Sequence, residues 1–344
     1  MPATDKTAPA PSAGAGEDGS REMYYAEALN DALRIEMQRD PRVIVLGEDL
    51  AEHGGAFQVT AGLLAEFGPM RIMQTPISEI GLVGTAVGAA LTGMRPVAEL
   101  MYIDFSGLAI DQIVNQAAQN RFMFGGQARV PLVVRTQGGS GRGNAAQHSK
   151  SLEAWFTHVA GLKVVMPSTP ADAKGLLASA IRDDDPVMFI EHKLLYRTKG
   201  QVPTGEFLVP LGKADVKRAG SDLTIVTWSR EVLFALEAAA TLAEEGISAE
   251  VIDVRSLVPL DKDAILSSVR RTRHCLVVHE AIKRGGYGGE IAALVAEEAF
   301  DDLDAPPRRL AGLETPIPYA QPLELGVVPQ AADIVRVARE LVRG

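Results

Sequence analysis

Short runs of consecutive apolar residues, each bounded by turn-forming residues, constrain the fold of this chain more than any other feature. A strand with one solvent-facing side alternates apolar and polar residues, whereas a strand covered on both sides is apolar throughout. In the first half of the chain such runs alternate with stretches of helical periodicity, which predicts a parallel sheet with helices on both faces. The expected strands are Val43–Leu46, Val97–Met101, Pro131–Arg135, Lys163–Met166 and Val187–Glu191, and the expected helices are Glu22–Gln38, Glu79–Thr92, Gly107–Phe122 and Ala171–Arg182.

The same rhythm restarts after a polar connection at residues 196–220. The expected strands there are Leu223–Thr227, Ala249–Val254 and Cys275–His279, and the expected helices are Glu231–Glu244, Asp261–Thr272, Gly289–Phe300 and Ala331–Val342. We therefore predict an α/β fold of two doubly wound, mainly parallel-sheet domains, 21–204 and 205–344. A disordered tail rich in Ala, Pro, Gly and Ser is expected at residues 1–20.

Charge and cysteine content exclude several classes of protein. Asp and Glu outnumber Lys and Arg by 44 to 34, and this net charge of −10 argues against a nucleic-acid-binding surface. The single cysteine, Cys275, excludes an internal disulfide framework and a Cys-rich metal site. The membrane-like stretch Ile80–Met94 is shorter than the ~20 residues of a transmembrane helix. Residues 1–20 lack the apolar core of a secretory signal and the Arg-rich, acid-poor composition of a mitochondrial presequence. These features predict a soluble cytoplasmic protein with no nucleic-acid or membrane partner.

Two carboxylates follow strands at the edge where ligands bind in doubly wound sheets. Glu48 comes directly after the strand Val43–Leu46, and Glu79 opens the helix Glu79–Thr92. A plainer interpretation fits equally well, because a first-turn carboxylate such as Glu79 favours the positive end of the helix dipole, with Ser78 as its N-cap. Glu48 is then a solvated loop acid, and the pattern alone leaves both interpretations open.

The helix that begins at Glu79 carries no charge after its first residue and contains Gly81, Gly84 and Gly88. Glycine inside a helix costs about 1 kcal/mol relative to alanine, so a compensating contact is expected. One interpretation is tight packing on the sheet, and the other is the close approach of a second helix across a subunit interface. An uncharged helix of this kind is expected to be buried all round.

The loop at residues 137–150, QGGSGRGNAAQHSK, consists mostly of small residues. Loops of this length without structure of their own tend to be functional or disordered. Histidine is the side chain that changes charge near neutral pH, so His148 near the loop's end is a candidate for proton transfer. A surface histidine in a flexible loop is the alternative interpretation.

Eight motifs in one register carry a resemblance to a known family. They are GED at 47–49, TPISE at 75–79, RPVAE at 95–99, DQIVN at 111–115, AQHS at 146–149, GLKVV at 161–165, DAKG at 172–175 and DDDP at 183–186. With these motifs the chain resembles beta subunits of the thiamine-diphosphate-dependent first component of pyruvate, branched-chain 2-oxo acid and acetoin dehydrogenase complexes. The resemblance covers about residues 21–341. It implies a pyrimidine-binding α/β domain followed by a transketolase C-terminal-like domain.

The resemblance also implies roles for individual residues. Glu79 is expected to hydrogen-bond the pyrimidine nitrogen of thiamine and favour the imino tautomer that deprotonates the thiazolium carbon, which needs a dry pocket. Glu48 is expected to relay protons in a tunnel between two active sites. His148 is expected to act in proton transfer or in handing the acyl group to a lipoyl sulfur. Ile77, Met101 and Phe105 are expected to form an apolar cradle for the pyrimidine, with Phe105 stacked on it.

A potassium site built largely from backbone carbonyls is a further implication of the resemblance. Its expected ligands are Leu132, Ala180, Ile181, Asp183 and Asp185, and Asp185 stands where the family often has asparagine.

The motif with which thiamine enzymes bind the diphosphate through Mg²⁺, GDG followed by a distant Asn, does not occur in this sequence. We therefore expect an alpha subunit to hold Mg²⁺ and the diphosphate in a heterotetramer of two alpha and two beta subunits. The expected activity is decarboxylation of a 2-oxo acid and transfer of the acyl group to the lipoyl domain of an acyltransferase core. One alternative is the cleavage of acetoin, which Asp104 and residues 123–126, 167–170 and 191–193 suggest. Another, of a different class, is a non-catalytic scaffold.

Overall fold

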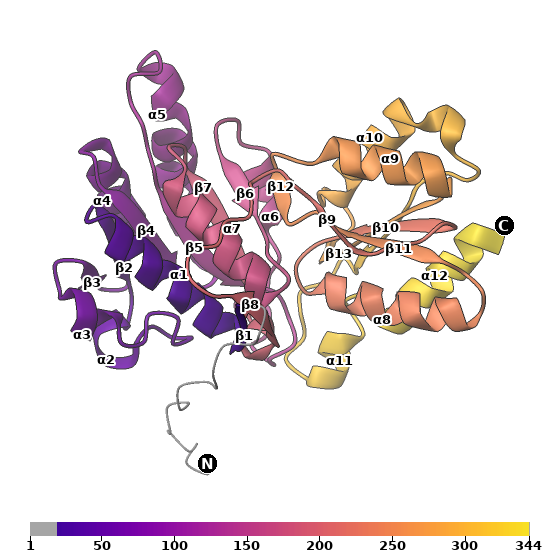
Figure 1. The fold of residues 1–344 in the computed structure, drawn as a ribbon, viewed down its shortest axis with the longest axis horizontal. Helices are drawn as coiled ribbons and strands as arrows, with labels where there is room; N and C mark the ends of the chain where they lie inside the picture. The colour runs from indigo at the N-terminus through magenta and orange to yellow at the C-terminus, as the bar shows by residue number, and fades with distance from the viewer. Residues whose placement is uncertain (1–18, 344) are drawn as a thin grey trace, which may run out of the picture.

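Two β-sheets, each covered by helices, lie next to each other and form the body of the molecule (Figure 1). The computed structural model describes residues 19–343, so the predicted tail lies outside the described residues except for Gly19 and Ser20. Ser20 begins β1 (Ser20–Tyr24), which pairs antiparallel with β8 (Lys199–Pro203). Of the helices between residues 19 and 343, none combines the length and the hydrophobicity that crossing a bilayer requires.

Six parallel strands and one antiparallel strand form the larger sheet, in the order β12-β6-β7-β5-β4-β2-β3. The predicted apolar runs form parallel strands because both faces of each strand are covered. The strands are β2 (Val43–Gly47), β3 (Ile72–Gln74), β4 (Arg95–Leu100), β5 (Val133–Gly138), β6 (Lys163–Val165), β7 (Val187–His192) and β12 (Ser256–Val258). The antiparallel edge strand β12 comes from the second half of the chain, so that half completes the sheet of the first.

Alternate residues of these strands enter two different cores. Val43 and Val45 of β2 pack with helices α1 and α7, whereas Ile44 and Leu46 pack with α4 on the opposite face. The helical segments of this half are α1 (Tyr25–Arg39), α2 (Leu50–His53), α3 (Leu63–Phe67), α4 (Glu79–Leu91), the 3-10 helix η1 (Ile103–Leu108), the π-helix η2 (Gln112–Ala117), α5 (Ala118–Met123), α6 (Glu153–Thr157), α7 (Pro170–Arg182) and the 3-10 helix η3 (Leu195–Arg197). Helices on both faces make the sheet doubly wound, as predicted.

Two of the predicted helices need correction. The helix expected from Glu22 begins at Tyr25, because the three residues before it hydrogen-bond with β8 as part of β1. The helix expected from Gly107 is divided, since η1 ends at Leu108 and the π-helical η2 interrupts the α-helical residues that follow.

The smaller sheet has the order β14-β13-β10-β11-β9 and is parallel except for β9. Helices α8 and α12 cover one face, and α9 and α10 cover the other (Figure 1). The strands are β9 (Asp215–Arg218), β10 (Leu223–Thr227), β11 (Ala249–Asp253), β13 (Cys275–Ile282) and β14 (Arg308–Gly312). The helical segments are α8 (Glu231–Glu244), α9 (Lys262–Thr272), α10 (Gly288–Glu298), the 3-10 helix η4 (Phe300–Asp302), α11 (Gln321–Leu325) and α12 (Ala331–Arg343). The predicted bounds of β10 and α8 are confirmed, as is the mainly parallel second sheet.

Within this chain the glycine-rich helix α4 is covered on one side only, so burial all round requires a second chain. Its inner face packs into the core, but Ile80 and Leu91 are 54% and 44% exposed. Gly84 lies against Gln112 of η2, whose Oε1 would be 3.2 Å from an added Cβ, whereas a Cβ on Gly88 would meet open space. Contacts within the chain therefore account for Gly84 and for Gly81, whose added Cβ would be 2.9 Å from Ser78 Oγ, but not for Gly88. Ile80, Gly88 and Leu91 form an uncovered surface that we call the α4 face.

A buried carboxyl lies where the two halves of the chain meet. Glu153 of α6 accepts a hydrogen bond at Oε1 from Trp228 Nε1 at 3.4 Å, and its Oε2 has no partner among the described residues. Burial raises the pKa of Glu153 from 4.5 to about 7.

We expect the substitution Glu153→Gln to flatten the dependence of stability on pH. Between pH 4.5 and 7 the folded chain keeps a proton on Glu153 that the unfolded chain has lost, so this group makes stability fall as pH rises. Between pH 5 and pH 8 the free energy of unfolding of the variant should fall by about 3 kcal/mol less than that of the wild type. Urea unfolding at the two pH values measures this difference. Glu297→Gln, at an exposed position of α10, serves as the control. A variant that keeps the wild-type slope would contradict the assignment.

Candidate active site

Two nearly buried carboxylates lie at the carboxyl end of the larger sheet. Glu48 follows β2 and is 7% exposed, and Glu79 begins α4 and is 8% exposed. Neither carboxylate has a hydrogen-bond or ion-pair partner among residues 19–343, although buried polar groups are almost always paired. Burial and the nearby charge of Glu79 raise the pKa of Glu48. The structure therefore brings the two predicted carboxylates close enough for the charge of one to act on the other.

A buried ion-pair network underlies this end of the sheet. Arg135 of β5 is fully buried, and its guanidinium binds both oxygens of Glu191 on β7 at 2.7 and 2.8 Å. Its third contact is with Glu99 on β4, at 2.8 Å. The Tyr196 hydroxyl also donates to Glu191, at 2.5 Å. The sequence patterns did not predict this network, although charged residues inside otherwise apolar strands were a visible signal.

His148 is held between two aromatic rings. The imidazole meets Tyr102 edge-on, with ring centroids 5.0 Å apart, and Phe105 edge-on at 5.3 Å. Tyr102 has a φ of 67°, a left-handed conformation that is strained for a bulky residue. The predicted proton-transfer residue and the predicted stacking residue therefore lie side by side.

Gln137 links the carboxylate network to the aromatic group. Its Nε2 donates to Glu99 at 3.3 Å, and its Oε1 accepts the backbone N–H of Tyr102 at 3.1 Å. The charge of Glu99 also raises the pKa of Glu48, so the Arg135 ion-pair network acts electrostatically on the Glu48–Glu79 pair. The structure thus gathers the predicted site residues at one end of the sheet.

Two members of the predicted apolar cradle are less enclosed than Phe105. Phe105 packs against the main core, and Met101 is half-buried. Ile77, in the turn between β3 and α4, is 78% exposed. A cradle that uses Ile77 would need a further surface to enclose it.

Lys193 is a site residue that the sequence analysis named only within residues 191–193, a segment that suggests acetoin cleavage, and to which it gave no role. Its Nζ donates to the backbone carbonyl of His148 and lies 5.5 Å from the centre of the Tyr102 ring. Burial lowers the pKa of Lys193 to about 8. Its position directly after the strand β7, at the same edge as the other site residues, was the signal that could have identified it.

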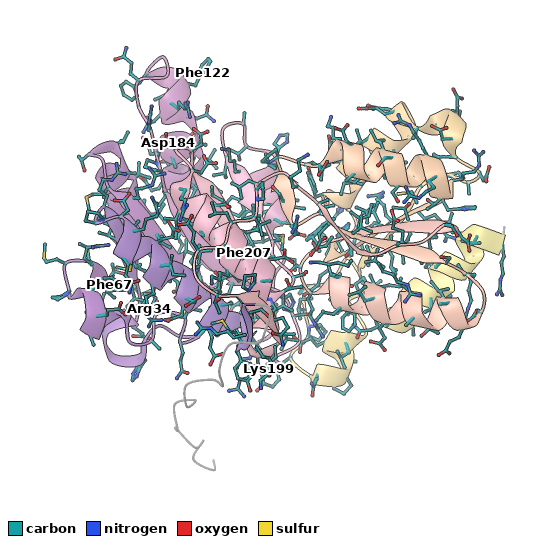
Figure 2. All side chains as sticks on the ribbon, viewed as in Figure 1. Arg34, Phe67, Phe122, Asp184, Lys199 and Phe207 are labelled. Carbon is teal, nitrogen blue, oxygen red and sulfur yellow. The ribbon has the colours of Figure 1, made fainter. Side chains whose placement is uncertain are left out.

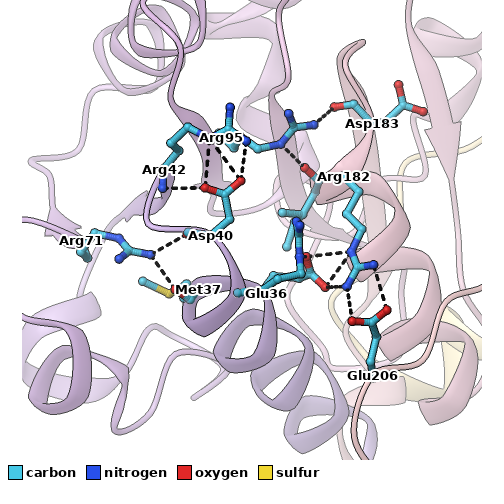
Figure 3. A network of polar contacts seen from close by, with 11 residues as sticks. Glu36, Met37, Asp40, Arg42, Arg71, Arg95, Arg182, Asp183 and Glu206 are labelled. Carbon is cyan, nitrogen blue, oxygen red and sulfur yellow. Dashed lines mark hydrogen bonds and ion pairs between the residues drawn. The ribbon is translucent and has the colours of Figure 1, made fainter.

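The predicted potassium ligands already have partners in the structure. The carbonyls of Ile181 and Asp183 accept hydrogen bonds from Arg95 at 2.8 and 2.6 Å (Figure 3). The Asp183 carboxylate pairs with Lys163, and that of Asp185 pairs with Lys163 and Arg121. The carbonyls of Leu132 and Ala180 accept backbone N–H groups. Each of these carbonyls keeps a second lone pair, and potassium binding at these residues stays a prediction.

A carboxylate pair at the carboxyl end of a doubly wound sheet, followed by a second mainly parallel domain, defines a transketolase-like protein. Residues 21–199 match the family model described as transketolase, pyrimidine binding domain, and residues 212–334 match that of the transketolase C-terminal domain. The solved structure of a split gene transketolase, an inactive beta4 tetramer, shares the fold with a TM-score of 0.77 at 24% identity. That match covers 93% of this chain and 98% of the other.

Two similar proteins show which members of this family the chain resembles. The beta subunit of acetoin:2,6-dichlorophenolindophenol oxidoreductase from Bacillus subtilis is 48% identical over 94% of this chain and 98% of its own. The mitochondrial pyruvate dehydrogenase E1 component subunit beta-2 of Oryza sativa subsp. japonica is 47% identical over 98% of this chain and 90% of its own. The chain belongs to this family of beta subunits of 2-oxo acid and acetoin dehydrogenase E1 components.

Proposed function

We propose that the chain is the beta subunit of a thiamine-diphosphate-dependent 2-oxo acid dehydrogenase of the pyruvate dehydrogenase type. With an alpha subunit it decarboxylates a 2-oxo acid and transfers the acyl group to the lipoyl domain of an acyltransferase core. The observation that carries the proposal is the Glu48–Glu79 pair at the carboxyl end of the larger sheet, the edge where ligands bind in doubly wound folds.

The residues present fit the aminopyrimidine half of thiamine diphosphate. When bound, that cofactor supplies a carbon nucleophile for the keto carbon of the substrate. Glu79 has an oxygen available to hydrogen-bond the pyrimidine ring nitrogen, and it lies near enough to Glu48 for its charge to raise the pKa of Glu48. Phe105 offers an aromatic face to the ring, and Met101 and Ile77 extend the apolar wall.

His148 and Glu48 handle protons in this proposal. His148 sits edge-on to Phe105, so it lies beside the reacting centre if the pyrimidine stacks there. It can then give a proton to the substrate's carbonyl oxygen, or to the thiolate that leaves when the lipoyl disulfide opens and its other sulfur takes the acyl group. Glu48 has a raised pKa and neighbours both Glu79 and Glu99, which suits a relay between acids.

An alpha subunit completes the site by holding Mg²⁺ and the diphosphate, for which this sequence has no GDG motif. Uncovered apolar residues support such a partner: the α4 face is exposed, Ile77 lies beside it, and Phe122 is 85% exposed at the outer end of α5 (Figure 2). A heterotetramer of two alpha and two beta subunits would cover these surfaces. A lipoyl-bearing acyltransferase core and a cytoplasmic location belong to the same proposal.

Acetoin is the second candidate substrate, and the motif that contains Asp104 favours it. The relative named for acetoin is 48% identical and the one named for pyruvate is 47% identical, so overall similarity does not separate the two substrates. Asp104 belongs to the motifs that suggest acetoin cleavage, and it lies next to the His148 loop, where it accepts hydrogen bonds from Lys150. The choice between them requires substrate assays on the assembled enzyme.

The purified chain alone should show no turnover, because it provides only the pyrimidine half of the site. Reconstitution with the alpha chain should give 2-oxo-acid-dependent reduction of a dye such as 2,6-dichlorophenolindophenol, measured in parallel with pyruvate, a branched-chain 2-oxo acid and acetoin. The alpha chain alone is the matched control. Activity of either chain by itself would refute the shared site, and a stable complex inactive on all three substrates would favour a scaffold.

A further inference from the structure

The loop that carries His148 is closed at its base and strained at its tip. At the base, the N–H of Gly139 donates to the carbonyl of Lys150 at 3.0 Å. At the tip, Gly141 and Gly143 have φ values of +101° and +66°, which favour glycine. A Cβ on Gly141 would overlap a methyl carbon of Leu194. The tip therefore adopts one specific conformation, which needs contacts outside the loop to hold it.

Glu324 supplies the first of these contacts from the C-terminal domain. It lies in α11, on the side of the smaller domain that faces the larger one (Figure 1), and its side chain is fully buried. Its two carboxylate oxygens accept the N–H groups of Gly141 and Gly143 at 2.6 and 2.9 Å. Hydrogen bonds from amides to a carboxylate are about twice as strong as neutral ones, so this contact fixes the tip firmly.

Glu280 of β13 supplies the second contact. One carboxylate oxygen accepts the N–H of Ser140 at 2.5 Å, and the other is 2.8 Å from Nε2 of His192. Nδ1 of His192 accepts the N–H of Leu194 at 3.1 Å, so Nε2 carries the proton and donates to Glu280. The next residue, Lys193, donates to the carbonyl of His148. Glu280 thus contacts the start of the loop directly, at Ser140. Through residues 192–193 it is also connected to the carbonyl of His148, near the end of the loop.

We propose that Glu324 and Glu280 are positioning residues of the C-terminal domain that set the place of His148 in the active site. The inference rests on the proposed role of His148. It gives the C-terminal domain a part in catalysis without contact with substrate, because two of its carboxylates fix a loop that belongs to the other domain.

The test compares Glu324→Gln and Glu324→Ala in the complex with the alpha subunit. The amide keeps one acceptor oxygen for the loop, whereas alanine keeps none, so the effects should be graded. Hydrogen–deuterium exchange of residues 139–150 should become faster in the order wild type, glutamine variant, alanine variant. The value of kcat should fall by about 10- to 100-fold in the alanine variant, with KM for the substrate changed less than about twofold, because misplacement of a reacting group slows the chemical step.

Glu314→Gln is the matched control, an exposed acid of the same C-terminal segment that lies 3.6 Å from Arg284 and away from the loop. It should change neither exchange nor kcat. Slower turnover without faster exchange of residues 139–150 overturns the inference, and so does faster exchange with normal turnover. A wild-type complex inactive on every substrate defeats the proposed function instead, and the exchange measurement then still decides whether Glu324 anchors the loop.

Discussion

Replacing Glu79 with glutamine should reduce turnover of the assembled enzyme by about 10²- to 10⁴-fold. The amide has the size of the carboxyl and keeps the start of α4, but it cannot gain and lose a proton, which the proposed tautomer change of the pyrimidine requires of residue 79. The measurements are the initial rate of dye reduction and the rate of hydrogen–deuterium exchange at the thiazolium carbon of bound thiamine diphosphate. Both rates should fall together, while binding of the alpha subunit should persist.

A first-turn acid of another helix separates this role from a purely structural one. Asp333 lies in the first turn of α12 and its side chain is 44% exposed, so Asp333→Asn removes a favourable interaction with a helix dipole at a position remote from the site. That loss is typically about 0.3–1 kcal/mol of stability, and no change in turnover is expected. If Glu79→Gln behaved like Asp333→Asn, the catalytic interpretation of residue 79 would be wrong.

Replacing Arg135 with methionine should lower the free energy of unfolding by about 3–5 kcal/mol. Methionine occupies a similar volume, but it leaves Glu99 and Glu191, 3% and 0% exposed, without the cation that compensates their charges. Urea unfolding followed by circular dichroism measures the loss. A triple variant that also carries Glu99→Gln and Glu191→Gln should recover part of it, because no unpaired charge then remains in the core.

Arg129→Met is the matched control for this substitution. Arg129 also pairs with an aspartate, Asp184, but its side chain is 67% exposed and the carboxylate 39%. Exposed ion pairs contribute about 0–1 kcal/mol, so the control should unfold nearly like the wild type. Equal effects of the two substitutions would mean that burial does not determine the strength of the Arg135 network.

Most strands of the two sheets could be predicted because their signal is local. Runs such as Val43–Leu46 and Leu223–Thr227 are apolar at consecutive positions, and only strands covered on both faces need that composition. β1 and β12 were not predicted, because each is short and forms only through a partner distant in the sequence. Their residues carry no apolar periodicity of their own, and pairing alone makes them strands.

The candidate site was predictable in part, for related reasons. Glu48 and Glu79 could be identified because they follow strands at the edge where ligands bind. The anchoring carboxylates Glu280 and Glu324 could not, since their partners in the His148 loop lie more than 100 residues earlier and belong to the other domain. Burial of α4 on every side stays a prediction, because an uncharged helix can be covered by a second chain as well as by its own.

The strand β12 belongs to the C-terminal half of the chain and is also the outermost strand of the larger sheet. A recombinant fragment that stops at residue 204 would therefore expose the unpaired backbone of β6 to solvent. Such an edge can pair with other chains, so the fragment should aggregate. Chimeras between relatives must accordingly exchange residues 256–258 together with the sheet they complete, and the two halves of this polypeptide are not interchangeable modules.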